Sequence, residues 1–301
     1  MAQPVRGTQT LVDQMGWVFQ RPSLVALEIA WRWLFGVPFL AVCWLQAHAI
    51  LRALPLDATG LTNLDMQNPW VAATQIASAW ARYEPHVAAV FVWFLPAAVV
   101  AWCVVSGVGR ALVFVRVEPG LRFRPLAMIA LQVKWLALWC VVFVGWLSAM
   151  RWAAANHIAA AGEPDLIGFS IWTVFLSLAF FTLWALVSWP VAAAPVLLLG
   201  EDRTVWSSLW ESLRLGRTLS AKLVETNLVM GIVKLALAVL AMVLSAAPLP
   251  FSDQLGPDAM HFVWLGAILF YLVASDYFHI VRMKGYIEFW RSLRGRKVRV
   301  R

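Results

Sequence analysis

Residues 195–217 read Pro-Val-Leu-Leu-Leu-Gly-Glu-Asp-Arg-Thr-Val-Trp-Ser-Ser-Leu-Trp-Glu-Ser-Leu-Arg-Leu-Gly-Arg and join two long apolar runs. The first run stops at Gly200, and an acidic turn follows. Thr204 is expected to be the N-cap of the next helix, because its hydroxyl can accept an amide hydrogen that the first turn leaves unpaired. Apolar residues then recur at helical spacing, and Gly216 is expected to end the helix. This stretch therefore predicts a short amphipathic helix at 204–215, on the cytoplasmic membrane surface between two spans.

The composition indicates the class of protein. Hydrophobic residues make up 62% of the 301 positions and charged residues 13%. A soluble domain has roughly 45–50% apolar and about 25% charged residues, so hydrocarbon is the expected solvent for most of these side chains. The 19 tryptophans favour the same class, because indole collects where hydrocarbon meets lipid headgroups. We predict a single all-α domain, a polytopic integral membrane protein with six transmembrane helices plus interfacial amphipathic helices.

Six apolar runs are long enough to cross a bilayer core, which takes about 20 residues. Span two is expected to kink at Pro96 and span four to break at Pro190 and Pro195, because proline removes a helical backbone hydrogen bond. The first run is too extended, and its charged leader too long, for a signal peptide. The predicted spans are 26–51, 87–115, 126–150, 169–199, 223–246 and 260–281, and the predicted interfacial helices are 8–20, 69–83, 204–215 and 285–294.

The basic residues predict the orientation. Lys and Arg concentrate in the amino-terminal segment, in the loops after spans two and four, and in the tail 282–301. Arg52, Arg82 and Arg151 lie on the other side. Because loops rich in Lys and Arg stay in the cytoplasm, both termini are expected to be cytoplasmic. An even number of spans is then required, and six satisfies it.

Several ionisable residues lie inside apolar runs or at their ends, where an isolated charge costs roughly 2.5–3.5 kcal/mol. One interpretation is a cytoplasm-facing polar cavity in which the acid of span six faces a lysine. The other is structural: the acid and the arginine of span one pair locally at i,i+4, and the lysines extend their stems to the interface. The intramembrane candidates are Glu28, Arg32, Lys134, Lys234 and Asp276.

No catalytic motif is present: the sequence lacks a Gly-rich phosphate loop, a Gly-x-Ser-x-Gly turn and an HExxH word. Asp276 and His279 share a helical face, which leaves open a proton relay or a helix end that satisfies its own hydrogen bonds. The other histidines fall near the outer ends of spans without the spacing of a metal-ligand pair. The three cysteines lie inside apolar runs, as small core residues do. We therefore predict no enzyme activity, no metal and no cofactor.

The carboxyl-terminal tail alternates aromatic and basic residues. Aromatic side chains insert at the membrane interface, and each nearby cation adds about 1 kcal/mol against an anionic leaflet. Nucleic acid would use similar residues, but a tail that directly follows a span meets lipid first. We therefore predict membrane lipids, anionic ones, as partners and no nucleic acid. The predicted headgroup-binding residues are Trp290, Arg291, Arg294, Arg296 and Lys297.

Residues 194–217 resemble the signature of the membrane domain attached to some bacterial glycerophosphodiester phosphodiesterases and of related stand-alone six-span proteins. In that group a span ends in Pro-Val, apolar residues and Glu, and a helix follows. Ser212, Leu213, Leu215 and Arg217 match that helix, whereas Trp210-Glu211 replaces a more basic pair. The resemblance implies six spans in a bacterial inner (plasma) membrane. It implies no activity, because the phosphodiesterase's catalytic barrel has no counterpart in this chain.

The function expected from the sequence is a non-catalytic multi-pass inner-membrane protein that organises partners or handles lipid. A membrane-protein partner and a homo-oligomer both stay open. The alternative is a transporter or permease subunit with a cytoplasm-facing polar cavity. Broken spans two and four favour this alternative, because irregular backbone at membrane depth usually lines a cavity. A lipid-modifying enzyme would need an acid–base pair that the sequence does not place.

Overall fold

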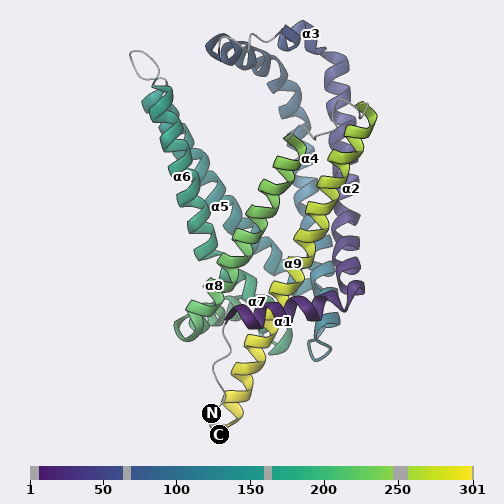
Figure 1. The fold of residues 1–301 in the computed structure, drawn as a ribbon, viewed down its shortest axis with the longest axis vertical. Helices are drawn as coiled ribbons and strands as arrows, with labels where there is room; N and C mark the ends of the chain where they lie inside the picture. Colours follow the sequence, from purple (N-terminus) through teal and green to yellow (C-terminus); the bar gives the residue numbers. More distant parts are fainter. Residues whose placement is uncertain (1–6, 64–68, 159–164, 247–256, 300–301) are drawn as a thin grey trace. The chain divides into compact units, whose positions relative to one another are not determined.

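The computed structural model describes residues 7–63, 69–158, 165–246 and 257–299, and these residues are helical almost throughout, without a β-strand. The all-α prediction is confirmed. The helices are α1 (Gly7–Phe19), α2 (Pro22–Ala53), α3 (Leu56–Thr59), the 3-10 helix η1 (Leu61–Asn63), α4 (Pro69–Val117), α5 (Pro125–His157), α6 (Leu166–Val187), α7 (Trp189–Gly200), α8 (Val205–Ala246) and α9 (Pro257–Arg299) (Figure 1).

The contacts of the chain group it into two compact units, whereas its sequence predicts one domain. The first unit consists of Met1–Ile29 and Gly107–Arg301, and the second of Ala30–Ser106. The first unit therefore contains α1, the start of α2, the end of α4 and all of α5 to α9. The second contains the rest of α2 and α4 with the short helices between them.

Five helical segments of the described chain are long and apolar enough to cross a membrane. They agree in position with five of the six predicted spans. Large apolar side chains along them are exposed, as hydrocarbon rather than water permits. In the described part of α8 the stretch Val229–Val243 is apolar but shorter. The five segments are Pro22–Ala53, Val71–Val117, Pro125–His157, Leu166–Trp184 and His261–Ser292.

Helix boundaries confirm one predicted break and overturn others. The chain breaks between α6 and α7 at Ser188, so that Pro190 falls in the first turn of α7, where a missing N–H costs little. At Pro195 the helix continues. The predicted stop at Gly216 is wrong, since α8 runs through it; a glycine inside a helix costs only about 1 kcal/mol relative to alanine.

Of the four predicted interfacial helices, only α1 is a separate helix. The segments 69–83, 204–215 and 285–294 are the ends of α4, α8 and α9. Each continues into the apolar run beside it, through Pro85 in α4 and through Gly216 in α8, so the helix propagates across the expected boundary. The sequence predicted their amphipathic character but placed breaks where the backbone makes none.

In the second unit, aromatic side chains join α2 to α4. Phe35 contacts Trp102 edge-on with ring centroids 5.1 Å apart, and Phe39 stacks on Phe94 at 5.2 Å. Beyond the end of α2, the Tyr83 hydroxyl donates a hydrogen bond to the Leu54 carbonyl at 3.0 Å. These contacts hold the two helices as a hairpin.

In the first unit, α7 is the most buried element. Residues 193–199 are all buried, and α7 packs against α5, α8 and α9. Helix α6 lies beside α5, and α8 runs along α9 (Figure 1). The short helix α7 is thus enclosed by protein, and the loops at its carboxyl end are held in place by it.

Gly107 provides a test of the packing between α4 and α5. A Cβ atom at this position would lie 2.5 Å from Ile129 Cγ1 and 2.7 Å from Ile129 Cα, so backbone must move to admit it. We expect Gly107→Ala to lower the free energy of unfolding by about 1–3 kcal/mol, as overpacking does. Thermal unfolding in detergent measures this. Gly36→Ala is the matched control, because nothing lies within 4 Å of a Cβ there, and an equal loss in both variants would contradict the close crossing.

Candidate functional site

A row of buried polar side chains runs along one face of α9. Asp276, His279 and Tyr286 are each buried, and Arg282 lies between them, half-buried. Spacings of three or four residues put all four on one side of the helix. Such groups are costly in a chain as apolar as this one, so they mark a candidate functional site. Tyr286 adds to it, because its buried hydroxyl has no hydrogen-bond partner among the described residues.

Glu28 of α2 joins this row. Its side chain is fully buried, and its Oε1 lies 3.7 Å from His279 Nε2. On the other side of the ring, Arg282 Nη2 lies 2.9 Å from His279 Nδ1. A guanidinium can only donate hydrogen bonds, so Nδ1 must accept, and the proton of the neutral imidazole sits on Nε2, toward Glu28. The three side chains therefore form a Glu28–His279–Arg282 cluster, buried at Glu28 and His279, that can hold or pass a proton.

The predicted intramembrane residues are only partly brought together. Asp276 shares the α9 row, and Lys234 is half-buried on α8, which packs along α9; their pairing stays a prediction. Lys134 is exposed, and its ammonium lies 4.8 Å from the centre of the Trp206 ring. Lys134 is therefore not the lysine that Asp276 faces, although the sequence leaves that pairing open. Arg32, in the second unit, lies over the Trp31 ring at 5.2 Å.

At Trp290, α9 packs against protein, which corrects this one residue of the predicted headgroup site. Trp290 is buried, and its Nε1 donates a hydrogen bond to Glu201 Oε1 at 3.3 Å. Gly200 makes room for it, because a Cβ there would lie 2.6 Å from Trp290 Cζ2. Trp290 thus fills a protein pocket and is not available to lipid. Sequence alone shows an aromatic–basic alternation but not this partner.

The basic residues of the same segment have different positions. Arg291 is 52% exposed and forms an ion pair with Glu118 at the end of α4, so part of its charge is compensated within the protein. Arg294, Arg296 and Lys297 lie on α9, but their side chains fall outside the described residues. Their predicted role at headgroups stays a prediction.

Helix α1 docks on α9 through polar contacts that the sequence did not predict. Gln14 Nε2 donates to Glu288 Oε2 at 2.9 Å, and the buried Lys284 ammonium lies 4.5 Å from the Trp17 ring centre. The Tyr277 hydroxyl donates to the Met15 carbonyl at 2.8 Å. In Figure 1, α1 lies across the lower part of α9. The predicted interfacial helix therefore has one face on protein.

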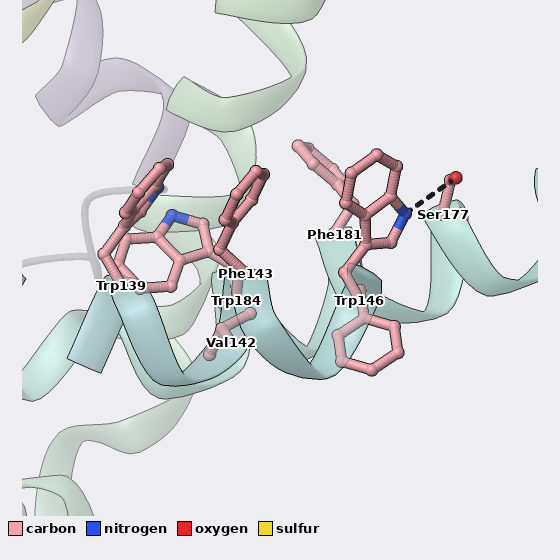
Figure 2. Close-up of a pocket in the computed structure, with 8 residues that line it drawn as sticks. Trp139, Val142, Phe143, Trp146, Ser177, Phe181 and Trp184 are labelled. Atoms are coloured by element: carbon pink, nitrogen blue, oxygen red, sulfur yellow. Dashed lines mark hydrogen bonds between the residues drawn. The ribbon is translucent and has the colours of Figure 1, made fainter. Parts of the chain in front are cut away.

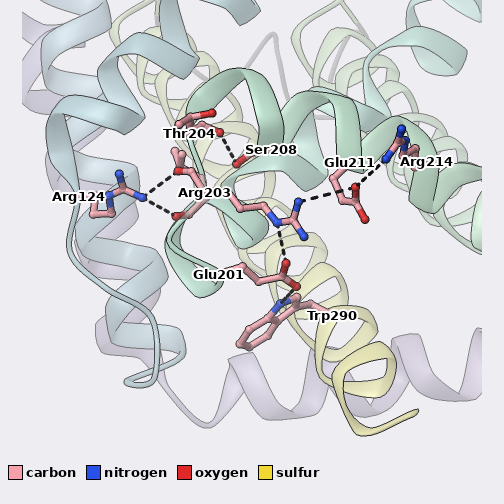
Figure 3. Close-up of polar contacts among 9 residues, drawn as sticks. Arg124, Glu201, Arg203, Thr204, Ser208, Glu211, Arg214 and Trp290 are labelled. Atoms are coloured by element: carbon pink, nitrogen blue, oxygen red, sulfur yellow. Dashed lines mark hydrogen bonds and ion pairs between the residues drawn. The ribbon is translucent and has the colours of Figure 1, made fainter. Parts of the chain in front are cut away.

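The loop between α7 and α8 is held by arginines. Arg124 Nη1 donates to the Arg203 carbonyl at 2.9 Å (Figure 3). The same atom donates to the Leu198 carbonyl at 3.3 Å and lies 3.0 Å from Asp202 Oδ1. Arg203 Nε in turn donates to Glu201 Oε2 at 2.8 Å. Asp202 adopts a positive φ of 54°, a conformation that non-glycine residues rarely hold unless neighbours fix it.

Thr204 caps α8 as predicted. Its hydroxyl oxygen accepts a hydrogen bond from the Ser207 amide at 3.2 Å, which pairs one of the free amides of the first turn. Ser208 donates to the Thr204 carbonyl at 2.9 Å (Figure 3). The start of α8 is therefore well defined beside the arginine-held loop.

An aromatic groove of about 270 Å³ lies between α5 and α6. One hydrogen bond crosses it, since Trp146 Nε1 donates to Ser177 Oγ at 3.1 Å (Figure 2). The groove is thus lined mostly by aromatic ring faces, which suits an apolar chain. The lining residues are Trp139, Val142, Phe143, Trp146, Ser177, Phe180, Phe181 and Trp184.

No group of three or more His, Cys, Asp or Glu side chains that could hold a metal ion occurs in the described part of the chain. His157 Nδ1 lies 3.1 Å from Asp165 Oδ2 near the start of α6. Two side chains form an ion pair but are fewer than the three that such a metal group requires. Comparison with family models, curated proteins and solved structures returned no match, so the resemblance of residues 194–217 stays a prediction.

Asp165 gives a pH-dependent prediction. The Gly168 amide and the His157 side chain both hydrogen-bond to this N-cap carboxylate, and they lower its pKa. A lowered pKa means that the capping contribution is present above the unfolded pKa of about 3.9 and is lost as pH falls through the folded value. We expect Asp165→Ala to lower the melting temperature in detergent at pH 7. This difference from wild type should shrink once pH drops below about 3.9.

Asp165→Asn is the control, because asparagine caps a helix nearly as well as aspartate but cannot titrate. At pH 7 its melting temperature should be close to that of wild type. Its advantage in melting temperature over Asp165→Ala should not decrease in acid. If the difference in melting temperature between wild type and Asp165→Ala stayed constant from pH 7 to below about pH 3.9, the ionised Asp165 carboxylate would not be the cap.

Proposed function

We propose that this chain is a non-catalytic, multi-pass protein of a bacterial inner membrane that handles lipid by holding a hydrocarbon chain. Six crossings with both termini in the cytoplasm are part of the proposal. The spans that support it are the five long apolar helices and the apolar stretch of α8. The packing of α1 on α9 supports the orientation, because it places the start of the first span and the end of the last on one side.

The aromatic groove between α5 and α6 carries the proposal. Both helices are long and apolar enough to span a membrane, so the groove would open to hydrocarbon. Its ring faces suit methylene groups through dispersion. The Trp146 indole N–H is paired with Ser177 within the groove, so an acyl or isoprenoid chain can lie against this ring without breaking or leaving unpaired that hydrogen bond.

Photocrosslinking with a phospholipid that carries a diazirine in its acyl chain tests this proposal in proteoliposomes. We expect adducts on Trp146 and Phe181 above the level found on other exposed apolar positions of the spans. Val142→Trp fills the groove and should reduce these adducts several-fold, because the ring occupies the space of the chain.

Val141→Trp is the matched control. Val141 is the neighbouring residue, 70% exposed, and does not line the groove. It should leave the groove adducts unchanged. If both variants gave the wild-type pattern, or if wild-type adducts were spread evenly over all exposed positions, the groove would hold no chain.

A second candidate function is transport coupled to protons, and the Glu28–His279–Arg282 cluster favours it. The His279 imidazole lies between a carboxylate and a guanidinium, and an imidazole can carry a proton on either ring nitrogen. Buried ionisable residues of this kind are frequent in the proton relays of transporters.

Proteoliposomes with a trapped pH dye test the transport candidate. A proton-conducting or proton-coupled protein should dissipate an imposed pH gradient, and His279→Gln should slow this to the rate of empty vesicles. His261→Gln is the control on the same helix, because His261 is exposed and about 27 Å away along α9. A gradient that persists with wild type, or decays equally with both variants, excludes proton coupling through this cluster.

A further inference from the structure

The first turns of α8 expose their apolar face. Trp206, Trp210 and Leu213 are 70%, 56% and 50% exposed, and their i, i+4, i+7 spacing places them on one side of the helix. The side that faces protein holds Ser208 and Ser212, which are fully buried. This is the reverse of a helix on a soluble protein, where the apolar side would be the covered one.

The buried serines need no other partner. Ser208 donates to the Thr204 carbonyl at 2.9 Å and Ser212 to the Leu209 carbonyl at 2.7 Å. Small, internally satisfied side chains let the helix lie close to its neighbours at no polar cost. The two tryptophans are therefore directed outward by the packing and are left to meet whatever surrounds the protein.

A basic side chain lies over each of these two tryptophan rings. The Lys134 ammonium lies 4.8 Å from the centre of the Trp206 ring, and Arg214 Cζ lies 5.8 Å from that of Trp210. Arg214 is partly compensated by Glu211, whose Oε2 is 3.9 Å away. Lys134 forms no ion pair with any described residue, although it sits in a helix apolar enough to span a membrane.

Lys134 is about 14 Å along α5 from the start of that helix, at 1.5 Å per residue. Its stem lets the ammonium reach the interface, where Trp206 meets it. An ammonium at that level is most stable beside an anion, and the described protein supplies no carboxylate there. The phosphate of a membrane lipid has the required charge and depth.

We propose that Lys134, Trp206, Trp210 and Arg214 form a binding surface for the headgroup of an anionic phospholipid, at the edge between α5 and α8. The indole rings insert among the headgroups, and the two cations pair with phosphate. This surface takes the role that the sequence assigned to Trp290, which is buried. It shares with the proposed function the placement in a membrane, but none of its residues lines the aromatic groove.

Native mass spectrometry of the full chain in detergent measures binding of phosphatidylglycerol and of phosphatidylcholine with identical acyl chains. We expect phosphatidylglycerol to bind more tightly. Lys134→Gln should weaken it about fivefold, the value of one cation near an anionic headgroup, and leave phosphatidylcholine unchanged. Trp206→Leu keeps an apolar side chain but loses the cation contact, so a twofold to fivefold loss is expected.

Arg151→Gln is the matched control: it removes one charge from an exposed residue on the same helix, about 26 Å from Lys134. This variant should bind both lipids as tightly as wild type does. If Lys134→Gln does not fold, Lys134→Arg serves, since it keeps the charge and should keep the preference for phosphatidylglycerol. Inorganic phosphate in large excess should not compete, because a lipid and not a free anion is the expected ligand.

Three outcomes would overturn the proposal: equal binding of the two lipids to wild type, equal losses in Lys134→Gln and Arg151→Gln, or displacement of the lipid by inorganic phosphate. A photoreactive residue at position 206 that crosslinks protein rather than lipid would also overturn it, in favour of a partner protein. If wild type gave no specific groove adducts but still preferred phosphatidylglycerol, only the proposed holding of a hydrocarbon chain would be wrong. If it gave groove adducts but showed no preference for phosphatidylglycerol, only the headgroup surface would be wrong.

Discussion

Helix α7 ends inside the protein, and the way its last carbonyl groups are paired determines how the surrounding loops are arranged. A helix end leaves carbonyls without intrahelical donors, and in apolar surroundings each must find a partner. Arg124 donates to the Leu198 carbonyl, and the Arg122 amide donates to that of Leu199 at 3.0 Å. The loop between α4 and α5 is thereby tied to the loop between α7 and α8. The same constraint explains why the break at Ser188 is buried, since an open break would leave backbone groups facing hydrocarbon.

The distribution of polar and apolar side chains between interior and surface is partly the reverse of that in a soluble protein. The interior of the first unit holds the Glu28–His279–Arg282 cluster and the serines of α8, while tryptophans and large aliphatic residues cover much of the outside. Because hydrocarbon does not penalise an exposed ring or aliphatic chain, the outer surface is free to be apolar. The interior polar groups then hold the helices together, as the contacts between α1 and α9 also do.

The two surfaces that we propose to bind lipid differ in chemistry, as the headgroup and the hydrocarbon chain of a lipid do. The groove between α5 and α6 is lined mostly by aromatic ring faces, which suits hydrocarbon. The edge between α5 and α8 has exposed indoles with a cation over each, which suits a charged headgroup. Helix α5 contributes to both, with Lys134 nearer its start than Trp139 and Trp146. The order along the helix therefore follows the order of a lipid, headgroup first and chain after it.

The sequence by itself determined the all-helical class, the positions of the long apolar helices, the break near Pro190 and the cap at Thr204. Each of these depends on residues close together in the chain, and local hydrogen bonding and hydropathy decide them. Only the tertiary structure decided which neighbour each amphipathic face meets. Periodicity showed that Trp206 and Trp210 share a side of their helix, yet not that this side is outermost. Likewise the aromatic–basic alternation around Trp290 suits lipid and protein equally, and Glu201, far away in the chain, decides between them by accepting the indole hydrogen bond.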